Sequence, residues 1–154
     1  MRTILLLTFS LLVFSGFVQA KKSPPNNAPI DIVVNRSKTC GCCGKWLEHL
    51  KNNNFNVVDN MLDDVQSIKT QHGVSPEMAS CHTALVGGYV VEGHVPASDI
   101  KKLLASKPKV IGISVPGMPA GTPGMEMGDK QDAYQVLSFD KNQKTHVFSQ
   151  YEAK

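Results

Sequence analysis

All four cysteines of this 154-residue chain fall in two short motifs. Cys40, Cys42 and Cys43 form the pattern C-x-C-C, and Cys81 stands much later in the chain, directly before His82. Three thiols so close together are too dense for ordinary core packing, and they suit either a soft metal ion or thiol chemistry. Because no cysteine lies elsewhere, we expect all four to serve one site.

The choice of metal follows from the ligand type and the crowding. Thiolates select Cu(I) and zinc, and carboxylates are scarce around the two motifs. A zinc site usually takes its ligands as two separated pairs around one tetrahedral ion, a pattern that the adjacent Cys42 and Cys43 fit poorly. Sulfur atoms that bridge several Cu(I) ions tolerate such crowding. The sequence therefore favours copper, held as Cu(I) in a thiolate-bridged site of several ions, over zinc.

Two alternatives to a metal site remain open for these thiols. One is a structural pair of disulfides, for which Cys40–Cys43 plus Cys42–Cys81 is sterically reasonable in an exported protein. The other is a thiol-disulfide oxidoreductase with Cys40 as nucleophile and Cys43 as the resolving thiol. The start of a helix favours the thiolate form, so we expect both of these thiols to be partly ionised when reduced. A reversible disulfide is compatible with metal binding, because its reduction restores the thiols that a soft metal requires.

Two histidines are expected near the cysteines. His82 adjoins Cys81, and His94 follows a predicted hairpin whose end should return to the start of the first helix. Either one is expected to be a metal ligand or the partner of a ligand, and the alternative for each is a loop histidine bonded to backbone. His49 lies about 10 Å along the predicted helix from Cys42, at 1.5 Å per residue, which is too far to share a metal.

Three methionines lie in a glycine- and proline-rich segment, residues 116–128. Met118, Met125 and Met127 are predicted either to supply thioether ligands or a transfer path for Cu(I), or to fill gaps in the core. The glycines of this segment would let it fold over the site.

The pattern of apolar residues predicts an α/β protein. A hairpin with a Gly87-Gly88 turn is expected over residues 83–91. The other predicted elements are strands at 30–34, 55–58 and 110–115, helices from 42 to the asparagines at 52–54, from 61 to 72 and from 96 to about 106, and a C-terminal hairpin of 134–139 with 145–151 appended to the core.

This order of elements resembles the thioredoxin/glutaredoxin core. In that fold a C-x-x-C motif begins the first helix, as Cys40 and Cys43 would here, and the loop before the third strand approaches it. That loop position corresponds to Cys81 and His82. Thioredoxins carry a cis-proline just before the third strand, whereas this chain has Cys81-His82-Thr83, a difference that argues against ordinary disulfide exchange.

The start of the chain predicts export. Arg2, the apolar run that follows it and the ending Val18-Gln19-Ala20 are typical of a secretory signal peptide, residues 1–20. An uncleaved anchor is the alternative, but the run is shorter than the roughly 20 residues that span a bilayer. Residues 21–29 are expected to form a flexible leader and residues 30–154 a single domain. With 16 basic and 13 acidic residues, the chain is too balanced in charge to indicate nucleic acid as a partner.

Five stretches together resemble the bacterial CopG copper-resistance family. They are CGCCGKW at 40–46, SCHTA at 80–84, GGYVVEGHVP at 87–96, PGMP at 116–119 and GMEMG at 124–128. The resemblance implies a periplasmic, thioredoxin-like, copper-binding protein that contributes to copper tolerance in Gram-negative bacteria. The cysteines of the family motif correspond to Cys40, Cys42, Cys43 and Cys81. We therefore expect copper as the bound ion, with interconversion of Cu(I) and Cu(II) as an additional role, and a copper exporter or a cupredoxin-like protein as partner.

Overall fold

The computed structural model describes residues 28–154, so the predicted signal peptide and most of the predicted leader lie outside the described part of the chain. The described residues form an α/β fold. Its elements, in chain order, are β1 (Ile30–Ser37), α1 (Gly41–Asn52), β2 (Phe55–Leu62), α2 (Gln66–Gln71), β3 (His82–Val86), β4 (Tyr89–Glu92), α3 (Ala97–Ser106), β5 (Gly112–Ser114), β6 (Tyr134–Phe139) and β7 (Thr145–Tyr151).

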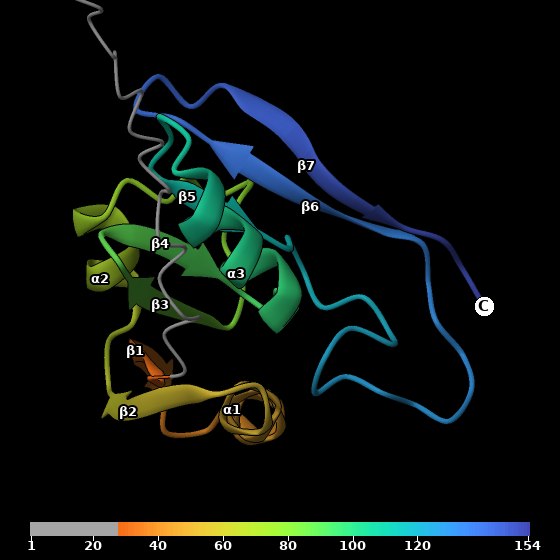
Figure 1. The fold of residues 1–154 in the computed structure, drawn as a ribbon. Coiled ribbons are helices and arrows are strands. Elements are labelled where there is room, and N and C mark those ends of the chain that lie inside the picture. The colour runs from red at the N-terminus through yellow and green to blue at the C-terminus, as the bar shows by residue number, and fades with distance from the viewer. Residues whose placement is uncertain (1–27) are drawn as a thin grey trace, which may run out of the picture.

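The seven strands form one continuous sheet in the order β2-β1-β3-β4-β5-β6-β7 (Figure 1). β1 runs parallel to β2 and β4 runs parallel to β5, while the other neighbouring pairs are antiparallel. The C-terminal hairpin was predicted as an appendage, but β6 pairs with β5 and so extends the same sheet.

The alternation of side chains divides the core between the two faces of the sheet. On one face, Ala84 and Val91 pack with Trp46 of α1 and Ile100 of α3 in the larger hydrophobic cluster. On the other face, a smaller cluster gathers Val74, Met78, Val90 and Phe139. This face is approached by α2 and the segment that follows it. Among the described residues, no helix is long and apolar enough to cross a membrane.

The predicted order of elements is confirmed, and the main error lies in the second helix. The helix was predicted to begin at Met61, but β2 continues through Leu62, since its parallel pairing with β1 extends as far as Ser37. The side chain of Asp64 accepts hydrogen bonds from the backbone N–H groups of Gln66 and Ser67, and α2 begins there instead.

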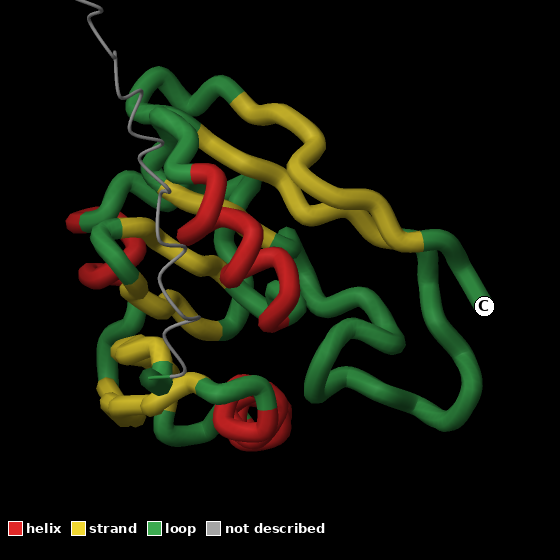
Figure 2. The backbone as a smooth tube through the Cα atoms, viewed as in Figure 1, coloured by secondary structure: helices red, strands yellow, loops and turns green. Residues whose placement is uncertain are grey.

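A long loop joins β5 to β6 and contains the methionine segment (Figure 2). It returns to α1, since a Cβ atom at Gly124 would lie 2.7 Å from the backbone nitrogen of Trp46. Gly124 also has a φ of +84°, which a residue with a side chain rarely adopts. The glycine therefore lets the loop lie directly against the first turns of α1.

Candidate metal centre

The first cysteine motif lies at the start of α1. Cys40 is the residue that precedes the helix, with an extended backbone (φ −79°, ψ 94°), and Cys42 and Cys43 belong to the first turn. Cys43 is fully buried, whereas Cys40 and Cys42 are half-buried. Cys40 and Cys43 form a disulfide, with their Cα atoms 5.6 Å apart, and Cys42 and Cys81 are free thiols.

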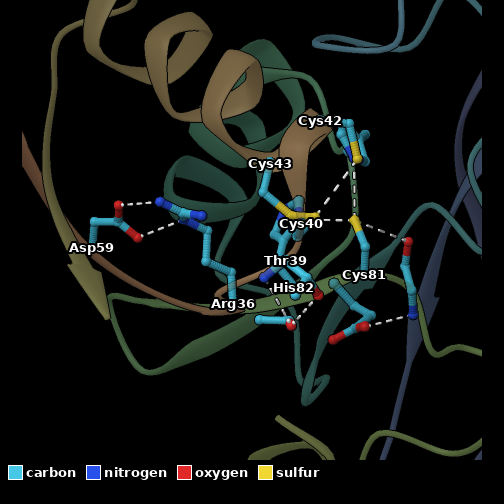
Figure 3. Close-up of a disulfide and its surroundings, with 12 residues drawn as sticks. Arg36, Thr39, Cys40, Cys42, Cys43, Asp59, Cys81 and His82 are labelled. Atoms are coloured by element: carbon cyan, nitrogen blue, oxygen red, sulfur yellow. Dashed lines mark hydrogen bonds and ion pairs between the residues drawn. A yellow bond between two sulfur atoms is a disulfide. The ribbon is translucent and has the colours of Figure 1, made fainter. Parts of the chain in front are cut away.

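Folding brings the sulfur of Cys81 to the other three. All four sulfur atoms lie within 4.8 Å of one another, and those of Cys40 and Cys42 are 3.6 Å apart (Figure 3). The predicted single cluster of four sulfurs is therefore present. Of the two bridges in the disulfide alternative, only Cys40–Cys43 is formed. The site can thus exist with one disulfide and two thiols, or with four thiols after reduction.

The two predicted histidines also meet at Cys81. Its sulfur lies 3.1 Å from Nδ1 of His82 and 3.2 Å from Nε2 of His94, and the three donor atoms form a second group compact enough to hold a metal. Nδ1 of His94 is 2.7 Å from the carbonyl oxygen of Pro123. Since a carbonyl oxygen only accepts hydrogen bonds, Nδ1 carries the proton, and the lone pair of Nε2 points toward Cys81.

His82 is held in an apolar environment. Its ring is fully buried, with its centroid 4.2 Å from that of Trp46, and within the described structure its Nε2 atom has no hydrogen-bond partner. Burial lowers the pKa of His82 far below its usual value, and the nearby charges of His94 and Lys69 act in the same direction. The ring is therefore neutral at pH 7. The nitrogen that faces the sulfur of Cys81 is Nδ1, so the neutral ring can offer a lone pair there, and the unpartnered Nε2 atom lies on the other side of the ring.

Cys81 is a thiol rather than a thiolate in the metal-free protein. Burial raises its pKa to about 12, and the neighbouring Cys42 contributes in the same direction. A cation at this sulfur would have to displace its proton, so binding should release protons and weaken at low pH. The donors of the site are sulfur and imidazole without any carboxylate, a combination that suits Cu(I) or zinc.

Two hydrogen bonds fix the segment 116–128, here called the methionine loop, beside this cluster. The hydroxyl group of Ser80 donates to the carbonyl oxygen of Gly117 over 2.6 Å, and the carbonyl of Pro123 accepts the bond from His94. Residues that adjoin or belong to the cluster therefore bind both ends of the segment between Gly117 and Pro123.

The predicted methionines occupy different places in this loop. Met125 and Met127 line a cavity of about 300 Å³ that also contains Cys42, Lys45 and Glu126. Met127 is 69% exposed, and Met118, next to the tethered Gly117, is 54% exposed. Two of the three methionines therefore share a cavity with one cysteine of the cluster, Cys42. Their role as ligands stays a prediction.

His49 has a structural role that the sequence did not indicate. Its Nε2 atom accepts a hydrogen bond from the backbone N–H of Ala97, at the start of α3, over 3.1 Å. Accepting this bond requires the neutral ring, and burial lowers the pKa of His49 below its usual value of 6.5, although Glu126 opposes the shift.

We expect this histidine to make the protein less stable in acid. As the pH falls from 7 to 5, the unfolded chain binds a proton that the folded His49 resists, so the free energy of unfolding decreases. One such proton contributes at most about 1.4 kcal/mol per pH unit. Urea unfolding of the metal-free protein at several pH values should show a shallower decrease for His49→Gln, whose amide oxygen still accepts the bond. His146→Gln, an exposed control, should retain the wild-type slope, and equal slopes for all three proteins would contradict the assignment.

The sequence did not indicate the polar network that lies beneath the cluster, in which every member except the half-buried Ser80 is buried. It consists of Lys69, Glu92, Thr83 and Ser80. The available signal was a glutamate at the end of the otherwise apolar strand β4.

The fold and the site define an α/β protein with two metal-capable groups that share Cys81, one of four cysteines and one of a cysteine and two histidines. A family model described as "Protein of unknown function, DUF411" matches residues 78–125. No curated protein matches the chain. Two solved structures, "Copper resistance protein copG- Form 2" and "Form 1", share 46% and 47% identity with it, each with a TM-score of 0.77 and with 80% of this chain and 98% of theirs covered. The chain belongs to the CopG family of copper resistance proteins.

Proposed function

We propose that this protein binds Cu(I) in the periplasm and thereby contributes to copper resistance. The observation that carries the proposal is the convergence of four cysteine sulfurs, from two distant motifs, within 4.8 Å. Cys40, Cys42, Cys43 and Cys81 would bridge several copper ions as thiolates. His82, His94 and the sulfurs of the methionine loop would complete the coordination. The name of the related structures supports copper as the ion.

Reduction of the disulfide is part of this proposal. Oxidation of two thiols to one disulfide releases two electrons and two protons, which is enough to reduce two Cu(II) ions to two Cu(I) ions. Cys40 and Cys43 form such a pair, and their disulfide lies within the cluster. The same site would therefore both hold copper and interconvert its two oxidation states, provided that a reductant restores the thiols.

The cellular location and the fold type belong to the same proposal. The signal-peptide pattern before Ala20 supports export to the periplasm. The thioredoxin-like description is supported by the C-x-x-C motif at the start of α1 and by the position of Cys81, in the loop before β3, facing that motif. The exposed Met118 and Met127 support contact with a copper exporter or a cupredoxin-like protein, which cross-linking in periplasmic extracts would test.

The Cys40–Cys43 disulfide favours a second candidate function, thiol-disulfide exchange. The sulfur of Cys42 is 3.6 Å from that of Cys40 and would capture a mixed disulfide formed there before a substrate could complete its exchange. We therefore expect little insulin reduction by the metal-free protein. Rapid turnover in that assay would favour the oxidoreductase.

Titration of the fully reduced protein with Cu(I) tests the main proposal. A chromogenic Cu(I) chelator in competition should report more than one tightly bound Cu(I) per chain, and a parallel titration with Zn²⁺ should show weaker binding. A single ion per chain would exclude the thiolate-bridged cluster, and preferential zinc binding would overturn copper as the cargo.

The single tryptophan provides an independent report on His82. Because the two rings lie 4.2 Å apart, copper binding at His82 should strongly decrease the emission of Trp46. The decrease should follow the Cu(I) titration in wild type and in His146→Gln, whose histidine is exposed in β7, and should be much smaller in His82→Gln. Unchanged emission at saturation would place the copper away from His82.

A further inference from the structure

One carboxylate is hydrogen-bonded on both sides of the Cys81-His82 pair. Oε1 of Glu92 accepts the backbone N–H of Ser80 over 2.6 Å, and Oε2 accepts the hydroxyl of Thr83 over 2.7 Å. These two partners are the residues immediately before Cys81 and immediately after His82. Glu92 thus fixes the ends of the dipeptide that brings a sulfur and an imidazole to the cluster.

Glu92 lies on the opposite side of the sheet from the ring of His82. Thr83 and His82 are consecutive in β3, so their side chains point to opposite faces. The ring of His82 packs on Trp46 of α1, whereas Thr83 and Glu92 meet Lys69 of α2. The contacts of Glu92 are therefore structural contacts behind the site, and its carboxylate is not one of the donors gathered around the sulfurs.

Among the described residues, the cation that pairs with the Glu92 carboxylate is Lys69. The two groups form an ion pair with an N–O distance of 2.5 Å, and their side chains are 0% and 6% exposed. Lys69 also donates to the hydroxyl of Thr83 over 3.0 Å. Burying two charges is costly, and apolar replacements of such pairs are often neutral or stabilising. The pair is therefore poorly explained by stability, and its contacts with Ser80 and Thr83 suggest a different role.

The same network extends to the methionine loop through Ser80. The serine donates its N–H to Glu92 and its hydroxyl to the carbonyl of Gly117, the residue before Met118. The space around Ser80 is restricted, because a Cβ atom at Gly93 would lie 2.7 Å from the Ser80 side chain. A shift of Glu92 would therefore be transmitted to Cys81 and to the loop at once.

We propose that Glu92, paired with Lys69, is the positioning residue that sets Cys81 and His82 in the geometry required for copper. This inference rests on the proposed function of the site. The carboxylate accepts hydrogen bonds from Ser80 and Thr83, the residues on either side of the dipeptide, and Lys69 orients the carboxylate. Ser80 connects these two hydrogen bonds to the methionine loop. None of these residues needs to touch the metal.

A pair of double variants separates the effect of the two Glu92 hydrogen bonds, to Ser80 and Thr83, from the effect of the buried charges of Glu92 and Lys69. Lys69→Met with Glu92→Gln removes both charges but keeps an amide oxygen for Ser80 N–H and an amide N–H₂ for the Thr83 hydroxyl. Lys69→Met with Glu92→Leu removes both charges and also both hydrogen bonds, to Ser80 and to Thr83. Thr83→Val removes one contact without altering either charge, and it serves as an independent test if a double variant does not fold.

Two measurements are made on each folded variant. The first is Cu(I) affinity of the reduced protein, by competition with a chromogenic chelator. The second needs no copper: in a Cys42→Ser background with the Cys40–Cys43 disulfide intact, iodoacetamide reports the exposure of Cys81 alone.

We expect the Leu double variant to bind Cu(I) about 10–100-fold more weakly, the range for loss of a group that orients a ligand. Cys81 of the Leu double variant should be alkylated several-fold faster than in wild type. The Gln double variant should resemble wild type in both Cu(I) affinity and alkylation rate. Thr83→Val should give values of both quantities between those of the two double variants. Equal behaviour of the Gln and Leu variants would overturn the proposal. If wild type itself bound no Cu(I), the proposed function would fail, and the alkylation rates would still decide whether Glu92 positions Cys81.

Discussion

Replacement of Cys81 by serine is expected to weaken Cu(I) binding more than any other single change described above. Its sulfur belongs to both groups of donors, with the other cysteines and with the two histidines. Since loss of an outer-shell partner alone costs about 10–100-fold in metal affinity, loss of this ligand should cost more than about 100-fold. The number of Cu(I) ions bound per chain should also fall. Both quantities follow from one chelator-competition titration of the reduced protein.

A matched control for Cys81→Ser removes a different sulfur. Met61 is 53% exposed on β2 and belongs neither to the cluster nor to the methionine loop, so Met61→Ser should bind copper as wild type does. Retention of wild-type stoichiometry by Cys81→Ser would show that the C-x-C-C motif binds copper without the second motif.

Replacement of Lys69 by methionine is expected to produce the largest loss of stability. The substitution leaves the Glu92 carboxylate buried without its counterion, and breaking a buried pair in this way typically costs about 3–5 kcal/mol. Burial already raises the pKa of Glu92 against the opposing effect of Lys69, so the carboxyl group should take up a proton more readily in the variant. Urea unfolding of the metal-free protein at pH 7 measures the difference, and acidification should narrow it.

The same substitution at an exposed pair is the control for Lys69→Met. Nζ of Lys38 lies 2.8 Å from Oδ1 of Asp63, and the two side chains are 56% and 86% exposed. An exposed pair contributes about 0–1 kcal/mol, so Lys38→Met should be close to wild type. Similar small losses at both positions would show that the buried Glu92 carboxylate does not depend on Lys69 as its counterion.

The sequence was sufficient to predict the parts of the site that local patterns determine. The C-x-C-C motif at a helix start, the glycine turn of the hairpin and the C-terminal strands are all found at the predicted places. The meeting of Cys81 with the other cysteines was predicted from a fold-level analogy and from the fact that all four cysteines lie in the two motifs, since no local pattern relates two motifs so far apart. The contact of the methionine loop with α1 likewise depends on a backbone approach at Gly124 that spacing alone does not show.

What the sequence could not supply was the set of partners chosen by tertiary packing. The pairing of Lys69 with Glu92 joins a helix to a strand on the face opposite the cluster, and either residue alone is typical of a surface position. The extension of β2 past Met61 was missed for a related reason, because its pairing with β1 outweighed the local helical pattern. His49 was predicted to lie too far along the helix to share a metal with Cys42, and its contact with α3 is a tertiary feature that the helical spacing does not show.

The unequal burial of the two bridged cysteines gives the disulfide a preferred direction of opening. Cys43 is inaccessible to solvent, so an incoming thiolate can reach only the sulfur of Cys40, and the electrons must flow toward Cys43. The departing thiolate is then released at the positive end of the α1 dipole, where negative charge is favoured. A reducing partner would thus become linked transiently to Cys40. The sulfur of Cys43 would then be the first of the two bridged sulfurs freed to receive copper.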